Sequence, residues 1–245
     1  MLAVLRSLAG YPRGVGLEQL ARDIDVPKSS LHRALAALCR AGLADHDERG
    51  SYRLALEFVR LGFAYYEQLD RRQVVGPLLE SLADRFGETA HYAELDSPEV
   101  VYLAKMTPPG QGAQMTSIVG GRNPAHCTGL GKALLAYELV DRGAVDAYVT
   151  ANGPLAQRTP NTLVGARALD ANLELVRGRG YALDAEESEE GINCIAFPLF
   201  LDHPTRPAGA VSVAALAHRT ALAQLEEAAG EVRGLIERAL GRVTR

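Results

Sequence analysis

Positively charged and hydrogen-bonding side chains gather on one face of residues 27–41, whose sequence is PKSSLHRALAALCRA. This face carries Lys28, Ser29, Ser30, His32, Arg33 and Arg40. The stretch contains no acidic residue, and its donors are concentrated toward the N-terminal end. A helix that enters the major groove of DNA contacts base edges and phosphates with such residues. We therefore interpret the stretch as a DNA-recognition helix, with a plain solvent-exposed helix as the alternative.

The elements around these residues fit that interpretation. Apolar Leu31, Leu35 and Leu38 recur at helical spacing, and Pro27 suits the first helical turn. Residues 17–24 have the same periodicity, and the short break before Pro27 makes a helix-turn-helix. Gly42 is a plausible C-terminal cap. Residues 43–54 alternate around a polar turn, which predicts a hairpin wing, where Arg49 and Arg53 could reach phosphates or a minor groove.

A second candidate site begins at Gly129-Leu130-Gly131-Lys132, which opens a predicted helix over residues 128–139. The free N–H groups and positive dipole end of a helix N-terminus attract anions. A nucleotide P-loop is excluded, because His126 and Ala133 stand where that motif needs Gly and Ser or Thr. The alternative is that the glycines serve only tight helix packing.

An acidic run extends from Asp184 to Glu190. Such a run usually forms a solvated loop, and we expect this of five residues in the stretch 184–191. Asp184 directly follows the apolar residues 181–183, so we expect its side chain to face the interior.

The cysteine and histidine residues could in principle form a catalytic site or a metal site. Cys127 or Cys194 with His91 or His126 could make a nucleophile and a base, or ligate a metal. The sequence supplies no orienting third group and no metal-ligand spacing such as C-x-x-C. We therefore expect no catalytic residue, no metal and no cofactor. The histidines at 46, 203 and 218 are expected in exposed loops.

Composition limits the class of protein. The chain of 245 residues has 47% hydrophobic and 23% charged residues and a net charge of −4, so any DNA contact must come from a local basic patch. Its three cysteines form no disulfide pattern, which suits a reducing cytoplasm. The N-terminal apolar run is too short for a signal peptide, and residues 192–201 are too short to span a bilayer. These features predict a cytoplasmic protein without membrane contact.

Periodicity predicts the remaining elements. Residues 1–9 form a helix with Leu2, Leu5, Leu8 and Ala9 inward. Residues 55–71 form a helix whose Phe63 and Tyr66 lie at a subunit contact. The rest predicts an α+β domain with an antiparallel sheet. Its expected helices and strands are helices 74–86, 128–139, 163–179 and 222–243, and strands 89–95, 100–106, 114–119, 193–200 and 208–216.

Four segments together carry a family resemblance: SSLHRALAALCRAGL, YRLALEFVRLG, HCTGLGKALLA and YALDAEESEEGINCIAFPLF. They resemble the IclR family of bacterial transcriptional regulators, and the similarity covers essentially the whole chain. The resemblance implies three parts: a winged helix-turn-helix domain at 1–55, a linker helix at 56–71 and a GAF-like effector-binding domain at 72–245. It also implies a dimer or a dimer of dimers, and a small, often carboxylate-bearing, effector.

Carried over position by position, the effector pocket of the family falls on Gly129, Leu130, Asp184, Cys194 and Ser212. Gly131 belongs to the same glycine element. Ala214 departs from the family pattern, which has a second serine there, so a larger or more apolar acid than glyoxylate is expected.

The resulting prediction is a regulator, most simply a repressor, which binds a partly palindromic double-stranded operator. A small organic acid in the C-terminal domain would change that binding. The alternative is a metabolite-binding or enzymatic α+β domain whose helix-turn-helix serves protein contacts.

Overall fold

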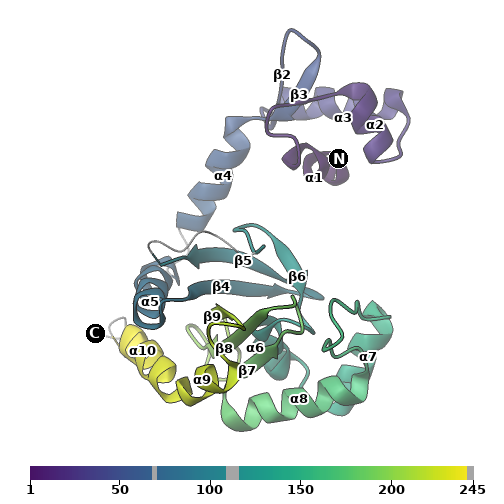
Figure 1. Cartoon of the computed structure of the whole chain (residues 1–245). Helices are drawn as coiled ribbons and strands as arrows, with labels where there is room; N and C mark the ends of the chain where they lie inside the picture. Colours follow the sequence, from purple (N-terminus) through teal and green to yellow (C-terminus); the bar gives the residue numbers. More distant parts are fainter. Residues whose placement is uncertain (68–70, 109–115, 242–245) are drawn as a thin grey trace. The chain divides into compact units, whose positions relative to one another are not determined.

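The computed structural model describes residues 1–67, 71–108 and 116–241. The chain forms two compact units, Met1–Arg72 and Gln73–Arg245 (Figure 1). Within the described residues, no helix combines the length and the apolar character that crossing a membrane requires.

The N-terminal unit packs its helices around one apolar core and a small antiparallel sheet. Its elements are α1 (Leu2–Ala9), β1 (Val15–Gly16), α2 (Leu17–Asp23), α3 (Lys28–Arg40), β2 (Ala44–His46), β3 (Ser51–Leu54) and α4 (Leu56–Glu67). The sheet has the order β1-β3-β2, and β2 and β3 form the predicted wing. Leu20, Leu31, Leu35 and Leu38 are almost fully buried. The same residues predicted as the buried face of α3 therefore hold it against α2.

Both ends of α3 follow from local chemistry. Pro27 is the N-cap, one residue before the helix. At the other end, Leu43 N–H donates to the Leu38 carbonyl at 2.9 Å and Gly42 N–H to the Cys39 carbonyl at 3.0 Å. Gly42 has φ +69°, the left-handed conformation that this pair of bonds requires. The prediction of Gly42 as the helix stop is confirmed.

One expectation for this unit is wrong, and one of its elements was not predicted. In α1, Val4 and Leu8 are buried, whereas Leu2 is 63% exposed and Ala9 is also exposed. The helix is short and its ends lie outside the core, so the apolar residues near its ends do not pack. Strand β1 was not predicted, because a two-residue strand has no periodicity of its own; it exists through pairing with Ser51 and Tyr52 of β3.

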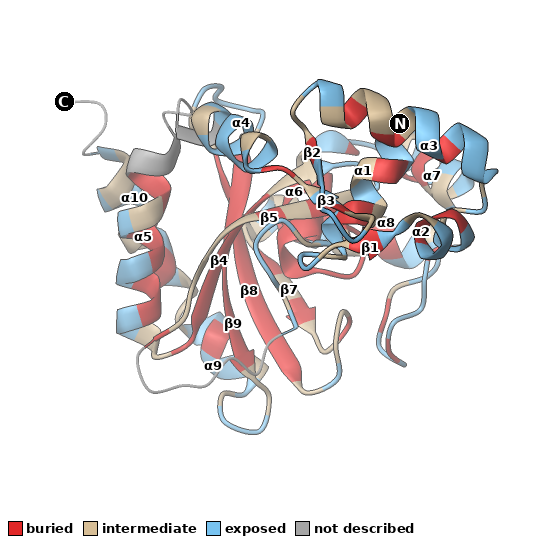
Figure 2. Cartoon of the chain, turned by 90° about the horizontal axis from the view of Figure 1, so that it is seen from above, coloured by how far each residue is buried: buried red, intermediate tan, exposed pale blue. Residues whose placement is uncertain are grey.

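The C-terminal unit is an antiparallel sheet of order β6-β5-β4-β9-β8-β7 with helices on both faces (Figures 1 and 2). Its strands are β4 (Thr89–Asp96), β5 (Glu99–Met106), β6 (Arg122–Pro124), β7 (Ala182–Ala185), β8 (Ile192–Leu199) and β9 (Gly209–Leu216). Its helices are α5 (Arg71–Phe86), α6 (Gly129–Glu138), α7 (Arg142–Asn152), α8 (Ala166–Arg179), α9 (Leu222–Glu227) and α10 (Ala229–Gly241). The predicted α+β class is confirmed.

The central strands place alternate residues in two different cores. On β9, Ala210 and Ala214 pack into the core with α6 and α8, while Val211 and Val213 pack into the core with α5 and α10. Both faces are buried, so these strands are buried along nearly their full length (Figure 2). Polar residues on the α6 side are therefore enclosed, and the cavity described below lies on that side.

Several predicted elements of this unit are corrected. Residues 116–119 are not a strand, because Gly121 N–H bonds back to the Ile118 carbonyl in a turn; positions 114 and 115 lie outside the described residues. The third strand of the predicted meander is instead β6. Helix α7 and strand β7 were not predicted. The expected helix 222–243 is divided at Ala228, beside the weak helix former Gly230. The helix expected at 55–71 is described as far as Glu67.

Candidate DNA-binding surface and ligand cavity

The predicted recognition residues are solvent-exposed on α3. Lys28, Ser29, Ser30, His32 and Arg33 all have exposed side chains. Neither His32 nor Arg33 has a hydrogen-bond or ion-pair partner within the described part of the chain. The surface therefore offers an imidazole and a guanidinium that can bond to bases or phosphates without first breaking an internal contact.

Lys28 is the exception, because its Nζ lies 2.6 Å from Glu18 Oε1 of α2. This hydrogen bond lowers the pKa of Glu18. Both side chains are well exposed, and exposed ion pairs contribute little to stability. Lys28 can consequently exchange Glu18 for a phosphate at small cost.

The backbone at the start of α3 adds donors to the same surface. Ser30 and Leu31 N–H groups both donate to the Pro27 carbonyl at 3.0 Å, and no side chain caps the helix. The N–H groups of Lys28 and Ser29 have no partner among the described residues. Free N–H groups at a helix N-terminus suit a phosphate oxygen.

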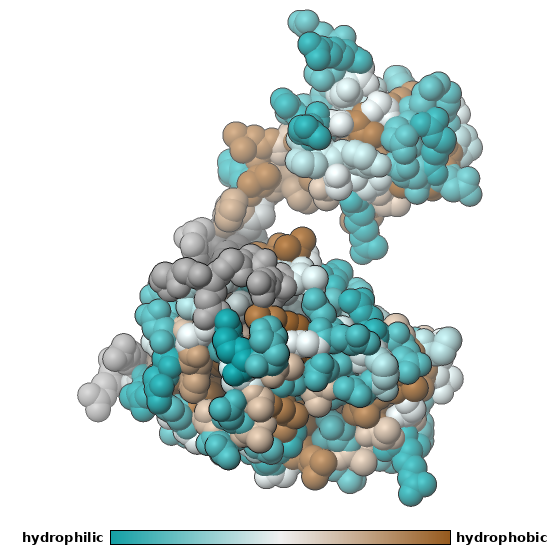
Figure 3. Space-filling model, viewed as in Figure 1, coloured by the Kyte–Doolittle hydropathy of each residue, from teal (hydrophilic) through white to brown (hydrophobic). Residues whose placement is uncertain are grey.

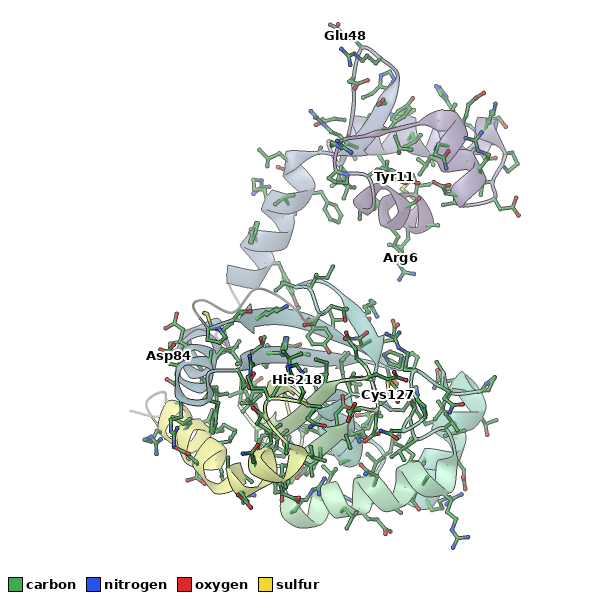
Figure 4. The ribbon with its side chains drawn as sticks, in the orientation of Figure 1. Arg6, Tyr11, Glu48, Asp84, Cys127 and His218 are labelled. Atoms are coloured by element: carbon green, nitrogen blue, oxygen red, sulfur yellow. The ribbon has the colours of Figure 1, made fainter. Side chains whose placement is uncertain are left out.

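The wing carries mixed charge. Asp47 Oδ1 accepts hydrogen bonds from Ser51 N–H at 2.8 Å and Arg49 N–H at 3.0 Å, which fixes the turn between β2 and β3. The Arg49 side chain is exposed, and Arg53 lies 3.8 Å from Asp45. Glu48 stands at the tip (Figure 4). Arg49 and Arg53 thus remain candidates for DNA contact on a hairpin that also presents acids.

A candidate ligand cavity lies on the α6 face of the sheet in the C-terminal unit. It is lined by His91, Tyr102, Thr116, Ser117, Asn123, Thr128, Gly129, Leu130, Asp184, Ser188, Glu189, Ile192, Cys194, Ser212 and Ala214. The volume is about 40 Å³, which is room for roughly three water molecules. Gly129, Leu130, Asp184, Cys194 and Ser212, predicted from the family resemblance, are brought together here. The expectation of an acid larger or more apolar than glyoxylate stays a prediction.

The glycines of α6 divide into two roles. Gly131 does not line the cavity: its N–H donates to Thr128 Oγ1 at 3.0 Å, and a Cβ there would overlap the Ala125 backbone. The packing alternative is therefore correct for Gly131, and its N–H is not available to a ligand. Gly129 does line the cavity, where a Cβ would come within 3.0 Å of Cys194 Sγ. The N–H groups of Gly129 and Leu130 have no partner within the described ranges.

The acidic run is not the solvated loop that we expected. Glu187 is buried, and its Oε1 accepts a hydrogen bond from Lys132 Nζ, which is fully buried on α6. Burial raises the pKa of Glu187, and Lys132 opposes that rise. Thr159 Oγ1 donates to the Glu186 carbonyl and Thr162 Oγ1 to the Glu187 carbonyl, each at 2.7 Å. The run is thereby fastened to α6 and to the segment before α8.

Asp184 is buried at the end of β7 and uses its oxygens within the same run. Oδ1 accepts from Glu187 N–H at 2.7 Å and Ser188 N–H at 3.3 Å, and Oδ2 accepts from Ser188 Oγ at 2.6 Å. Burial raises the pKa of this carboxyl, and the bond from Ser188 opposes the rise. Asp184 therefore shapes the cavity wall by holding the turn, with much of its accepting capacity already used.

Ser212 on β9 is the unsatisfied group of the cavity. Its hydroxyl is buried and makes no hydrogen bond of normal geometry within the described residues; it interacts only with the Cys194 thiol, a weak acceptor. Buried polar groups are rarely left unpaired, since an unmade hydrogen bond costs free energy. A bound molecule would satisfy this hydroxyl. Ser212 pairs across the sheet with His91 of β4, so the two side chains are neighbours on one face.

Residues missed by the sequence analysis are Tyr102, Asn123, Thr128, Ser117 and Ser188. Asn123 lies on the unpredicted strand β6, and Thr128 is the N-cap of α6. Ser117 and Ser188 lie outside helices and strands. His91 was considered only as a base or a metal ligand. The available signal was a histidine among Ala90, Tyr92 and Ala93, a polar side chain on a strand that is otherwise apolar.

The thiols are not arranged for catalysis. Burial raises the pKa of Cys127 to about 12 and also raises that of Cys194, so both stay protonated near neutral pH. Cys127 Sγ contacts the Pro124 carbonyl at 3.5 Å, and His126 Nε2 contacts the Ala156 carbonyl at 3.0 Å. Figure 4 labels Cys127 inside the C-terminal unit. In the described parts of the chain, no cluster of histidine, cysteine or acidic side chains is placed to hold a metal.

Comparison with protein families gives matches to both units. The model described as "Bacterial transcriptional regulator IclR C-terminal" matches residues 63–238, and the IclR helix-turn-helix domain matches residues 1–48. The HTH-type transcriptional regulator XynR of Escherichia coli (strain K12) is 33% identical over 232 residues, covering 92% of this chain and 89% of that protein.

Solved structures are similar as well. Thermotoga maritima IclR has 28% sequence identity and a TM-score of 0.72, with 97% of this chain and 96% of that chain covered. An IclR homologue from Microbacterium hydrocarbonoxydans, crystallised with 4-hydroxybenzoate, shares the fold at 23% identity and a TM-score of 0.78, covering 98% and 99%. The relatives are transcriptional regulators and not enzymes. Because both units match and the similarity extends along nearly the whole sequence, this chain belongs to the IclR family of DNA-binding bacterial transcriptional regulators.

Proposed function

We propose that this protein binds a partly palindromic operator as a homodimer or a dimer of dimers, and that a small carboxylate in the cavity changes that binding. The N-terminal part of α3, with Lys28, Ser29, Ser30, His32 and Arg33, enters the major groove. Arg49 and Arg53 of the wing contact the backbone or a minor groove. Repression is the output that we expect, and the protein works in the cytoplasm, where operator DNA is found.

The observation that carries the ligand part is the buried Ser212 hydroxyl, which has only the weakly accepting Cys194 thiol beside it, in a cavity at the start of α6. The free N–H groups of Gly129 and Leu130 lie at the positive end of the α6 dipole, which favours a carboxylate there. Ser212 supplies a third donor. Gly129 has no side chain to block the approach, since a Cβ at this position would crowd Cys194 and Ala196.

The cavity volume limits the acid. The described residues leave room for roughly three water molecules, which favours a small acid. Acids of two to four carbons are therefore the first candidates. A ligand acts as a switch only if it binds the DNA-competent and DNA-incompetent states unequally.

The dimer proposal is supported by α4. Leu56 is 80% exposed and Phe63 is 62% exposed, and apolar side chains follow the helix (Figure 3). An exposed apolar helix of this kind marks an interaction surface. The side chain of Tyr66, the other predicted contact, lies outside the described residues. A dimer presents two recognition helices to successive major grooves of a palindromic site.

The test begins with a thermal-shift screen of the full chain against two- to four-carbon carboxylates, because a ligand of the folded state raises its stability. Each hit is then added to gel shifts on upstream DNA at two salt concentrations. We expect a strong salt dependence of DNA binding and a changed DNA affinity with the hit. Ser212→Ala should lose the response, and Ser81→Ala, on the exposed side of α5, should keep it. A response that survives Ser212→Ala would move the ligand elsewhere.

A further inference from the structure

Four residues opposite the α6 end of the cavity form a connected group without charge. His91 Nε2 lies 2.8 Å from Ser117 Oγ, the His91 ring contacts the Tyr102 ring edge-on at 5.5 Å, and Asn123 Nδ2 donates to Tyr102 Oη at 3.2 Å. All four line the cavity. We refer to His91, Tyr102, Ser117 and Asn123 as the neutral wall.

We propose that the neutral wall makes this site specific for an acid that carries one carboxylate and one hydroxyl group, against plain acids and dicarboxylates. The inference rests on the proposed function, because it takes the carboxylate to lie at the start of α6. It adds that the end of the ligand away from the carboxylate carries a hydroxyl group.

The wall retains hydrogen-bonding capacity toward the cavity. Tyr102 Oη accepts from Asn123, so its own O–H is available to donate, and burial keeps this phenol protonated. Within the described residues, the hydrogen bonds of these side chains use Asn123 Nδ2 and His91 Nε2, so Asn123 Oδ1 can accept, and so can His91 Nδ1 when Nε2 donates to Ser117. The wall thus offers both a donor and acceptors. A hydroxyl group can use both at once, whereas a carboxylate can only accept.

Charge excludes a second carboxylate. Among the described residues, the charged side chains that line the cavity are those of Asp184 and Glu189, and no lysine or arginine is among them. Lys132 is engaged by Glu187, and Lys105 donates to the Ser117 carbonyl at 2.7 Å. A dicarboxylate would bring its second charge to uncharged groups beside two acids, and the single positive charge of Lys105 that reaches His91 does not balance them. Unpaired charge in a buried site is strongly unfavourable.

The two ends are close enough for one small molecule. His91 and Ser212 are direct partners between β4 and β9, and the Cβ atoms of such pairs are about 5 Å apart. An acid that bonds to Ser212 and to the Gly129 and Leu130 N–H groups therefore has its other end next to the wall. A hydroxyl two or three carbons away from the carboxylate spans this distance.

The test is titration calorimetry of the full chain with two matched series: propionate, 3-hydroxypropionate and malonate, then butyrate, 4-hydroxybutyrate and succinate. In at least one series we expect the hydroxy acid to bind about 2- to 12-fold tighter than the plain acid, the value of one neutral hydrogen bond. The diacid should bind at least about tenfold more weakly than the hydroxy acid.

Variants locate the preference. Tyr102→Phe removes only the hydroxyl, and His91→Leu removes the imidazole; each should reduce the hydroxy-acid preference while affinity for the plain acid changes less than about threefold. His218→Leu, at an exposed histidine, is the matched control and should keep the preference. Thermal unfolding checks that each variant is folded. If His91→Leu does not fold, the result for Tyr102→Phe alone decides.

The outcomes separate the two proposals. Binding of acids without a hydroxyl preference, tighter binding of the diacid, or a preference that persists in both variants overturns the neutral wall and leaves the proposed function standing. Absence of binding by every acid in both series overturns the carboxylate site, and the wall with it.

Discussion

The buried histidine of the cavity makes a quantitative prediction about pH. Burial lowers the pKa of His91 from its ordinary value of 6.5 to about 3, and the positive charge of Lys105, its cross-strand neighbour, acts in the same direction. The unfolded chain therefore binds a proton at His91 that the folded protein does not bind between pH 6.5 and 3. Stability due to this residue is complete above the unfolded pKa and is lost as the pH falls through this window.

The size of the effect follows from the two pKa values. Lowering the pH from 7 to 5 should cost the folded state about 2 kcal/mol through His91 alone. In His91→Gln this contribution is absent. The difference in stability between pH 7 and pH 5 should therefore be about 2 kcal/mol smaller in the variant, or about 4–8 °C in the shift of the unfolding temperature.

The assay is thermal or urea unfolding of the full chain and of His91→Gln at pH 7, 6 and 5. The comparison uses only the pH dependence, so any constant loss caused by the substitution cancels. Other titrating groups contribute equally to both proteins. Equal pH dependence in the two proteins would mean that His91 is protonated as easily in the folded chain as in the unfolded one, and the enclosed neutral wall would be wrong.

The other predictions concern DNA, assembly and the buried ion pair. Arg33→Ala should weaken operator binding by about 1–3 kcal/mol in a gel shift, while Arg6→Ala, on the side of the N-terminal unit opposite the wing tip (Figure 4), should not; equal effects would place the DNA surface elsewhere. Phe63→Glu should shift sedimentation toward monomer, and Leu175→Glu, at an exposed leucine of α8, should leave it unchanged; a wild-type monomer at micromolar concentration would refute the α4 contact. Lys132→Met should destabilise the protein by about 3–5 kcal/mol because it leaves Glu187 buried without its partner, and adding Glu187→Leu should recover most of the loss in urea unfolding. Failure of the second change to recover stability would show that the pair does more than neutralise its own charges.

Local patterns in the sequence determined the elements of the DNA-binding unit. The apolar spacing of Leu31, Leu35 and Leu38 sufficed to predict which face of α3 is buried, because helical periodicity depends only on neighbours within two turns. Gly42 marked the helix stop for the same local reason. The class of the second unit and the positions of its long strands also followed from composition and alternation, since both are properties of single segments.

The cavity, by contrast, depends on contacts between distant segments. Glu187 was assigned to solvent, and this failed because its partner Lys132 could be identified only once the chain was folded. Gly131 was assigned to the ligand, although its partner Thr128 is the N-cap only three residues before it and was a local signal. Lys132 and Glu187 are 55 positions apart, and each alone reads as a surface residue. His91 and Ser212 become neighbours only through the pairing of β4 with β9. Residue types and the family resemblance indicated a ligand site, but strand register and burial decided which of its groups are free to bind, because hydrogen-bond satisfaction is a property of the whole fold.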